Sequence, residues 1–444
     1  MVINCLLIII LLKLTFVAKI RYSIKQDKME KNLDQKQTQE YNINNLLTKD
    51  YSYILPPERI PKYPVEKRDQ SNLLIYKNKL IKKDKFENLG QYLDPNCCLV
   101  FNNTKVIQAR IFFYKETGAK IEIFCIEPYK PRNYELAFKQ KEKCTWKCII
   151  GNLKKWKENT ISTSFIHKGK RYVLTAEILN HNRSFQKVQF RWNNKNLSFG
   201  EVLEITGITP IPPYLNRETE TSDKERYQAI YSKNKGSVAA HTAGLHFTFN
   251  LLNKLDGIKI ELIPITLHIG TGTFKPINSE KIINHEMHKE HFFVSRKSIK
   301  NIIENINNIV TVGTTSLRTL ESIYWTGVKI LENIINKESS FNISQWEAYE
   351  LNQDVPVLTA LNAVLEFMEN NQLNIINGST QMMIVPGYEF RLVKGLITNF
   401  HLPKSTLLLL ISAFIGEDWK RVYHFALENN FRFLSYGDSS LLYR

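Results

Sequence analysis

The chain has 444 residues, of which 43% are hydrophobic, and it carries 60 Lys and Arg against 43 Asp and Glu. This composition excludes a disordered or fibrous protein and allows two or three globular domains with sizeable cores. The net charge of +17 favours a polyanionic partner such as nucleic acid or a membrane surface, although the Lys-, Asn- and Ile-rich runs are also typical of AT-rich coding sequence.

The N-terminal segment contains an apolar run from Cys5 to Leu12, which Lys13 interrupts. No positive charge precedes this run and no Ala-x-Ala site follows it, so it is a poor signal peptide, and it is too short for a membrane span. Three readings stay open: a targeting segment, a disordered extension, or an upstream start codon with translation beginning at Met29. We favour the last two and leave residues 1–45 out of the predicted fold.

The structured part of the sequence begins near Tyr51. Arg68 and Asp69 lie just ahead of a predicted strand over residues 73–76, where they could form a plain loop or pair with a substrate. A second predicted strand starts at Cys98 and ends in a polar tip, Asn102 to Lys105.

Residues 106–207 have a different sequence pattern, in which short strand-forming runs are separated by turn residues. The predicted strands are 109–114, 119–126, 172–179 and 188–192. The pattern indicates a small all-β, barrel-like domain inserted into a larger α/β domain made of residues 46–105 and 208–444.

The inserted segment is also the most basic part of the chain. Between Tyr129 and Arg171 there are twelve basic residues against three acidic ones. Such a cluster suits an RNA contact, with Lys154, Lys155 and Lys157 as its centre. Trp146 and Trp156 could add base stacking, although tryptophans are more commonly buried.

Helical periodicity returns over residues 223–231 and is followed by a run of small residues, Gly236 to Thr248. Small residues permit close backbone approach, and His246 within this run is either a candidate acid or base or a packed side chain. A predicted strand over 263–269 then runs into Gly270 and Gly272.

Two further strand-to-helix junctions follow. The strand 309–312 leads through Gly313, Thr314, Thr315 and Ser316 into a predicted helix over 317–325, and N–H groups and hydroxyls gathered at a helix N-terminus suit a carboxylate, ribose or phosphate. The spacing does not match a Walker loop.

The last junction is the most informative. A buried strand over 396–400 is followed by Pro403, and Ser405 or Thr406 can cap a helix over 407–414. His401 and Lys404 therefore lie on a tight turn beside free helix N–H groups. Repeated strand-loop-helix units of this kind place their polar tips on one edge of a sheet.

Cysteine and histidine spacing gives little support for a metal. The six cysteines lack the paired C-x2-C arrangement of a structural zinc site, so free buried thiols are expected. His285, His288 and His291 recur every third residue, but they do not form the His-Glu-x-x-His pair of zinc enzymes.

Eight blocks of sequence together resemble the S-adenosylmethionine:tRNA ribosyltransferase-isomerases of queuosine biosynthesis. In chain order they are LPPERIPKYPVEKRDQS (55–71), VFNNTKVIQAR (100–110), SVAAHTAGLHFT (237–248), LHIGTGTFKPI (267–277), HEMHKE (285–290), VGTTSLRTLE (312–321), PGYEFRLVKGLITNFHLPKST (386–406) and FRFLSYGD (431–438). Because eight ordered blocks cover residues 50–440, chance does not explain the resemblance.

The resemblance implies an α/β main domain interrupted by a β-barrel-like domain, in a cytoplasmic, monomeric enzyme without a metal, a prosthetic group or a membrane association. Its partners would be S-adenosylmethionine, as the ribosyl donor, and a tRNA whose wobble base is 7-aminomethyl-7-deazaguanine. The HEMHKE block matches the family, so its histidines are no special sign of zinc.

The implied reaction needs a base for the C5′ proton, an acid for the departing adenine and a fixed geometry. We predict His246 or His401 as the base and Glu389 as a second acid or base. The predicted residues for binding S-adenosylmethionine are Arg68, Asp69, Thr242, Gly270, Gly272, Gly313, Thr314, Thr315, Ser316, Lys404 and Ser405. The predicted nucleic-acid contacts are Lys105, Arg110, Lys154, Lys155 and Lys157.

Three positions depart from the family pattern. His241 and Gln108 stand where proline is expected, and Asn72 stands where arginine is expected. They put local turn geometry and one charge contact in doubt.

The rival hypotheses are a simple RNA-binding module and a membrane-tethered or exported protein. Adenine release on mixing with S-adenosylmethionine and precursor tRNA would distinguish the enzyme from the RNA-binding module.

Overall fold

The computed structural model describes residues 43–181, 185–270, 272, 276–335 and 341–444. The chain divides into two compact units. In its described part, the first contains residues 43–50 and Ser279–Asn284, which pair through a bridge between Leu47 and Lys281. The second contains residues 51–278 and 285–444 and carries both sheets. The N-terminal extension was predicted over residues 1–45, and residues 1–42 of it lie outside the described residues.

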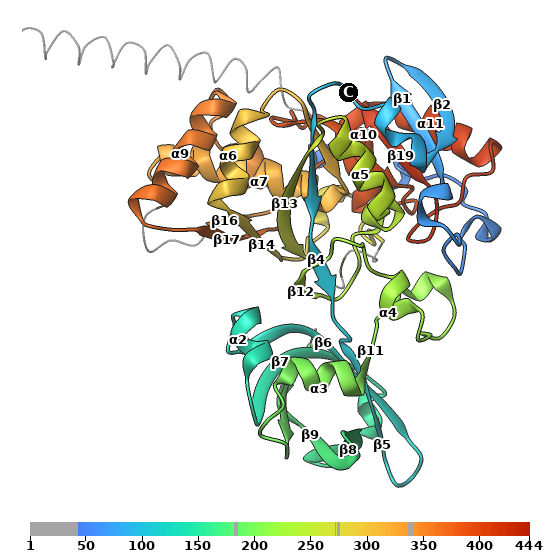
Figure 1. The fold of residues 1–444 in the computed structure, drawn as a ribbon, viewed down its shortest axis with the longest axis vertical. Coiled ribbons are helices and arrows are strands. Elements are labelled where there is room, and N and C mark those ends of the chain that lie inside the picture. The colour runs from blue at the N-terminus through green and yellow to red at the C-terminus, as the bar shows by residue number, and fades with distance from the viewer. Residues whose placement is uncertain (1–42, 182–184, 271, 273–275, 336–340) are drawn as a thin grey trace, which may run out of the picture. The chain divides into compact units, whose positions relative to one another are not determined.

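A ten-stranded mixed sheet forms the centre of the second unit (Figure 1). Its parallel middle is β13, β3, β15 and β18, with Thr311 of β15 opposite both Val100 and Leu396. In spatial order the strands are β16 (Phe341–Ile343), β17 (Ile375–Thr380), β14 (Glu290–Ser295), β13 (Glu261–His268), β3 (Cys98–Asn102), β15 (Ile309–Val312), β18 (Val393–Asn399), β19 (Ser439–Tyr443), β1 (Asn72–Lys77) and β2 (Leu80–Lys85).

Helices pack on this sheet because the buried strands present apolar side chains on both faces. Leu99, Val310 and Ile397 contact Leu251 and Leu255 of α5 in one core. The long helix α7 contacts β3, β13, β15 and β18 and packs against α9. The helices of this part are α4 (Asp223–Arg226), α5 (Phe249–Gly257), α6 (Arg296–Glu304), α7 (Thr314–Leu331), α8 (Glu347–Glu350), α9 (Val357–Asn370), α10 (Thr406–Ile415) and α11 (Asp418–Glu428).

The segment predicted as an inserted β domain forms a separate seven-stranded antiparallel sheet. β5 and β8 approach each other although they are far apart in the hydrogen-bonded order, so the sheet curls into a half-barrel. The strands in order are β11 (Gly207–Ile208), β5 (Arg110–Tyr114), β6 (Lys120–Lys130), β7 (Lys143–Gly151), β10 (Gln186–Trp192), β9 (Lys170–His181) and β8 (Thr160–His167), with helices α2 (Tyr134–Lys139) and α3 (Phe199–Thr206). A two-stranded parallel pair, β4 (Thr104–Val106) with β12 (Asn234–Ser237), completes the strands.

The predicted fold class is confirmed: a mixed sheet with helices, and a separate half-barrel. The exact division at residues 46, 106 and 208 stays a prediction. Trp146 and Trp156 are 0% and 8% exposed and belong to the core of the half-barrel, so the stacking alternative for these tryptophans is wrong.

The predicted helix over 223–231 is wrong beyond its first turn, because α4 ends at Arg226. Arg68 accounts for the difference. Its Nη2 donates to the carbonyl of Glu225 at 2.8 Å, and its Nη1 donates to the carbonyl of Gln228 at 2.8 Å. A helix continued to residue 231 would use the carbonyl of Glu225 for its own hydrogen bond to the N–H of residue 229. A tertiary contact from a distant residue therefore ends the helix.

Candidate active site

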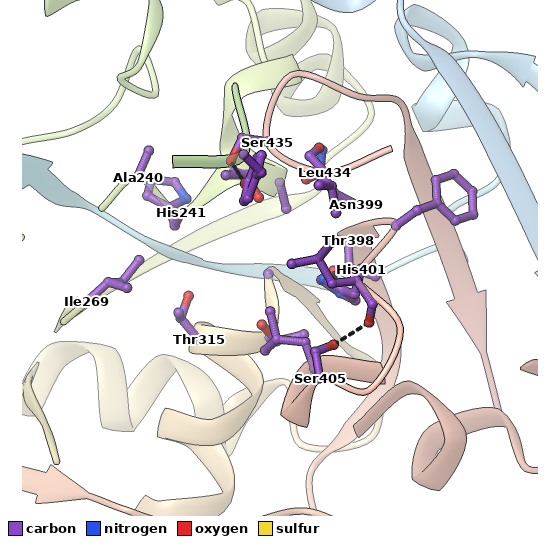
Figure 2. Close-up of a pocket in the computed structure, with 18 residues that line it drawn as sticks. Ala240, His241, Ile269, Thr315, Thr398, Asn399, His401, Ser405, Leu434 and Ser435 are labelled. Atoms are coloured by element: carbon purple, nitrogen blue, oxygen red, sulfur yellow. Dashed lines mark hydrogen bonds between the residues drawn. The ribbon is translucent and has the colours of Figure 1, made fainter. Parts of the chain in front are cut away.

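A pocket lies at the carboxyl ends of β13, β15 and β18 (Figure 2). It contains about 650 Å³ of unfilled space, part of which is open solvent. Its walls include Ile269, Gly313 and Asn399, each at or directly after the end of one of these parallel strands. The predicted convergence of polar strand ends on one edge of the sheet is therefore confirmed for these three junctions.

The N-terminus of α7 forms one wall of the pocket. Gly313 precedes the helix with φ of 89°, a backbone conformation that favours glycine, and no side chain caps the helix. Thr314 and Thr315 line the pocket, so the first N–H groups of an 18-residue helix lie beside it. These groups and the helix dipole favour a negatively charged group. Ser316 does not line the pocket, since its hydroxyl donates to the carbonyl of Val312 at 2.7 Å.

The turn after β18 supplies a second wall. His401 is 8% exposed, and its Nε2 forms a hydrogen bond with Thr398 Oγ1 at 3.0 Å. Its backbone N–H donates to Tyr423 Oη at 3.1 Å, which holds the turn in place. Burial lowers the pKa of His401 to about 3, so the imidazole is neutral at physiological pH.

Ser405 and Lys404 have different roles in that turn. Ser405 is the N-cap of α10, as predicted, since its Oγ accepts from the backbone N–H of Leu408 at 3.2 Å, and it also lines the pocket. Lys404 is exposed, has φ of 56°, and does not line the pocket. Its backbone, not its ammonium group, makes the contacts shown by the structure.

His241 is a pocket residue that the sequence interpretation treated only as a departure from the family pattern. It is 4% exposed, stacks on Tyr231 with ring centroids 5.5 Å apart, and lines the pocket next to Thr242. Neither ring nitrogen has a hydrogen-bond partner among the described residues. Burial lowers its pKa to about 3. The sequence feature that could have indicated His241 as a pocket residue is a single imidazole among the small residues of SVAAHTAG.

Asn399 adds a second polar atom without a partner. Its Nδ2 donates to the carbonyl of Leu434 at 3.1 Å and to His246 Nε2 at 3.2 Å, while its Oδ1 has no partner in the described part of the chain. The pocket thus combines an acceptor oxygen, a neutral histidine and a helix N-terminus. This set can hold a ligand that carries an amino group and an anionic group.

His246 lies outside this pocket, behind Asn399. Its Nδ1 bonds to Ser71 Oγ at 2.7 Å, and its Nε2 accepts from Asn399, so both ring nitrogens are occupied. Its pKa is lowered to about 4, first by burial and then by the nearby charges of Arg432 and Arg68. A histidine held in this way positions its neighbours more readily than it takes a proton from a substrate.

Several predicted residues are not brought to the pocket. Glu389 has a 63% exposed side chain and lies 3.6 Å from the guanidinium of Arg391. Asp69 accepts from Thr248 at 2.7 Å. Gly270 and Gly272 lie against the ring of His288. The structure therefore gathers Thr242, Gly313, Thr314, Thr315, His401 and Ser405 from the predicted set, and it leaves the others outside.

The histidines of the HEMHKE region do not converge. His288 Nε2 bonds to Glu290 Oε1 at 3.1 Å, and Glu290 is also paired with Arg318 at 2.7 Å. Among the described residues no group of three or more His, Cys, Asp or Glu side chains has the geometry of a metal site. No helix within the described residues is both long enough and apolar enough to cross a membrane.

The predicted nucleic-acid residues lie on or next to the half-barrel. Lys154, Lys155 and Lys157 are exposed, and the first two belong to a short 3-10 turn after β7. Arg110 Nε is 2.9 Å from Glu122 Oε1, so its charge is partly balanced. Lys105 is half-buried on β4.

Parallel strands that end at a polar pocket beside helix N-termini are typical of α/β enzymes that bind nucleotide-like or anionic small molecules. The family model for the queuosine biosynthesis protein matches residues 48–442. The chain therefore belongs to the family of S-adenosylmethionine:tRNA ribosyltransferase-isomerases, and it is a transferase-isomerase of tRNA modification in queuosine biosynthesis.

Curated relatives of that name support this assignment. One from Clostridioides difficile (strain 630) is 35% identical over 404 residues, covering 89% of this chain and 99% of the relative. Another from Sulfurihydrogenibium sp. (strain YO3AOP1) is 36% identical over 403 residues, covering 88% and 98%. A crystal structure of S-adenosylmethionine tRNA ribosyltransferase from Thermotoga maritima, 26% identical, covers 88% of this chain and 99% of its own, but its TM-score of 0.42 is too low for a structural comparison.

Proposed function

We propose that this protein transfers the ribosyl part of S-adenosylmethionine to the aminomethyl group of 7-aminomethyl-7-deazaguanine at the tRNA wobble position. The ribosyl group rearranges to an epoxycyclopentanediol, which gives epoxyqueuosine-tRNA, while adenine and methionine leave. The match to the family over residues 48–442 is the observation that carries this proposal. We expect a cytoplasmic monomer that uses S-adenosylmethionine as a substrate and needs no prosthetic group.

The pocket offers a place for each part of S-adenosylmethionine. The N–H groups at the start of α7, beside Thr314 and Thr315, suit the methionine carboxylate. The unpartnered Oδ1 of Asn399 suits an amino group of the ligand. Because the sulfonium already activates C5′, the chain must mainly hold the donor and exchange protons.

His401 is the better candidate for the base, and His241 joins it. Both imidazoles line the pocket, and this position supports the assignment. Burial keeps both unprotonated, and the pKa of about 3 makes each a weak base until a bound ligand changes its surroundings. His246 is better assigned to positioning Asn399, since both of its ring nitrogens are occupied. Glu389 stays a candidate acid only if the substrate reaches its exposed carboxylate.

The test is release of adenine and methionine from S-adenosylmethionine and precursor-modified tRNA, with the modified tRNA followed by mass spectrometry. Wild-type protein should release adenine only when both substrates are present. His401→Ala and His241→Ala should each lower turnover by about a hundredfold if they exchange protons. His424→Ala, at a 73% exposed position, is the matched control. An inactive wild type would refute the function, and two fully active pocket variants would refute the roles.

We also propose that the exposed lysines of the half-barrel contact tRNA. Replacing Lys154, Lys155 and Lys157 together by Gln should lower the slope of log affinity against log salt by about 2, since each phosphate contact contributes about 0.7–0.9. If the slope of log affinity against log salt is unchanged, these lysines do not contact tRNA, and their number reflects the base composition of the coding sequence.

A further inference from the structure

A second cavity, separate from the pocket, is lined by three arginines. It contains about 270 Å³ of unfilled space, open to solvent. Arg68, Arg226 and Arg432 line it together with His246, and no Asp or Glu is among its lining residues. Ser435 lines both this cavity and the pocket, so the two spaces share a wall. We call it the arginine cavity.

Two of the arginines are held by neutral backbone groups. Arg68 donates to the carbonyls of Gln228 and Glu225 at 2.8 Å each, and to that of Leu245 at 3.1 Å. Arg226 donates to the carbonyls of Glu66, at 3.0 Å, and Val65. Carbonyl oxygens fix the direction of a guanidinium but leave its charge in place. The guanidinium groups of Arg68 and Arg226 are therefore held rigidly and keep their charge beside the cavity, whose exposed lining is mostly apolar.

Arg432 is the least constrained of the three. Its Nη2 lies 3.5 Å from Asp438 Oδ1 and has no hydrogen-bond partner among the described residues, although it is buried. The carboxylate of Asp438 is already bound by the backbone N–H and side-chain amide of Asn72 and by the backbone N–H of Arg432. Arg432 thus has an unsatisfied, buried donor beside the cavity.

The positive charges of the arginine cavity act on one another. The pKa of Arg68 is lowered first by burial and then by the charge of Arg226, and Glu225 only partly offsets this. The carboxylates near these guanidinium groups are the buried Asp438, the exposed Glu225 and the buried Asp223. Asp223 accepts from the cavity-lining Tyr436 and is already paired with Arg217 at 2.6 Å. An anion that entered the cavity would relieve this repulsion, and a single guanidinium can bind two oxygens of a phosphate through two parallel N–H bonds.

We infer that the arginine cavity binds a backbone phosphate of the tRNA, next to the nucleotide whose base enters the pocket. This assignment rests on the proposed function for its choice of RNA. The shared wall at Ser435 supports it, because a nucleotide with its phosphate in the cavity would have its base or sugar near the pocket. The same cavity could take the carboxylate of S-adenosylmethionine, and the experiment separates the two anions.

The experiment compares Arg432→Gln and Arg226→Gln with wild type. The probes are an unmodified anticodon stem-loop RNA, titrated by fluorescence anisotropy over a range of salt concentrations, and S-adenosylmethionine, titrated by calorimetry. Arg432→Gln breaks no described hydrogen bond of the guanidinium Nη2, and Arg432→Lys keeps its charge. Arg421→Gln is the matched control, since Arg421 is exposed and paired with Asp418 away from the cavity.

The expected result is a loss of RNA affinity of about tenfold for each Gln variant, and a salt slope lower by about 0.7. Affinity for S-adenosylmethionine should stay at the wild-type value even where the melting temperature falls, since Arg226→Gln loses two hydrogen bonds to backbone carbonyls and Arg432→Gln loses the charge beside Asp438. Arg432→Lys should recover part of the RNA affinity. Normal RNA affinity in both Gln variants overturns the inference. So does a loss confined to S-adenosylmethionine, or a loss of both ligands with a lower melting temperature. If wild type binds the RNA but releases no adenine from precursor tRNA, the proposed function fails while the phosphate site stands.

Discussion

His241 should make the folded protein sensitive to acid. Its imidazole is 4% exposed and has no hydrogen-bond partner among the described residues, so burial lowers its pKa from 6.5 to about 3. Between these two values the unfolded chain binds one more proton than the folded chain. The free energy of unfolding is therefore unaffected above pH 6.5 and falls as the pH drops from 6.5 towards 3.

The size of this effect follows from the shift. Each pKa unit corresponds to about 1.4 kcal/mol, so at about pH 5 His241 alone should lower the free energy of unfolding by about 2 kcal/mol. His246, His268 and His401 are also buried, with pKa values lowered to about 4, 3 and 3, and they act in the same direction. Their sum is comparable with the total stability of a typical domain, about 5–15 kcal/mol.

The assay is urea unfolding of wild type, His241→Gln and His424→Gln at several values between about pH 5 and pH 7. His241→Gln removes one titrating group, so its loss of stability across this range should be smaller than that of wild type by about 2 kcal/mol. His424→Gln changes an exposed histidine and should behave as wild type. If His241→Gln and wild type lose the same stability with falling pH, His241 is already protonated or solvated in the folded protein, and the reasoning fails.

Three further substitutions test the packing around the site. Glu290→Gln removes the partner of the buried Arg318, which should cost about 3 kcal/mol in urea unfolding at neutral pH; an unchanged stability would show that the guanidinium does not depend on this carboxylate. Gly327→Ala places a methyl group 2.1 Å from the carbonyl oxygen of Ala360, so packing should lose about 2 kcal/mol; a higher melting temperature would refute this contact. Ser405→Ala removes the cap of α10 and should cost about 1 kcal/mol, whereas Ser405→Asp should retain most of it; equal losses would exclude capping as the cause.

The strand ends were predictable because they depend on local patterns. Apolar runs followed by glycine, hydroxyl or proline residues mark the ends of β15 and β18 in the sequence, and the parallel arrangement brings these ends together. The N-cap at Ser405 follows from the same kind of local rule.

The direction of individual side chains was not predictable, because distant contacts set it. His246 is turned away from the pocket by its bonds to Ser71 and Asn399, which are far from it in sequence. His241 enters the pocket wall because its ring stacks on Tyr231. Glu389 has a promising position next to β18 in the sequence, but its side chain points to solvent.

The amide of Asn399 joins the interior of the protein to the pocket. Its Nδ2 donates to His246 Nε2, which requires that this nitrogen carry no proton. If His246 took up a second proton, this hydrogen bond would be lost, and the amide would be held by its bond to the carbonyl of Leu434 alone. The position of Asn399 in the pocket wall therefore depends on the ionisation of a side chain that does not line the pocket.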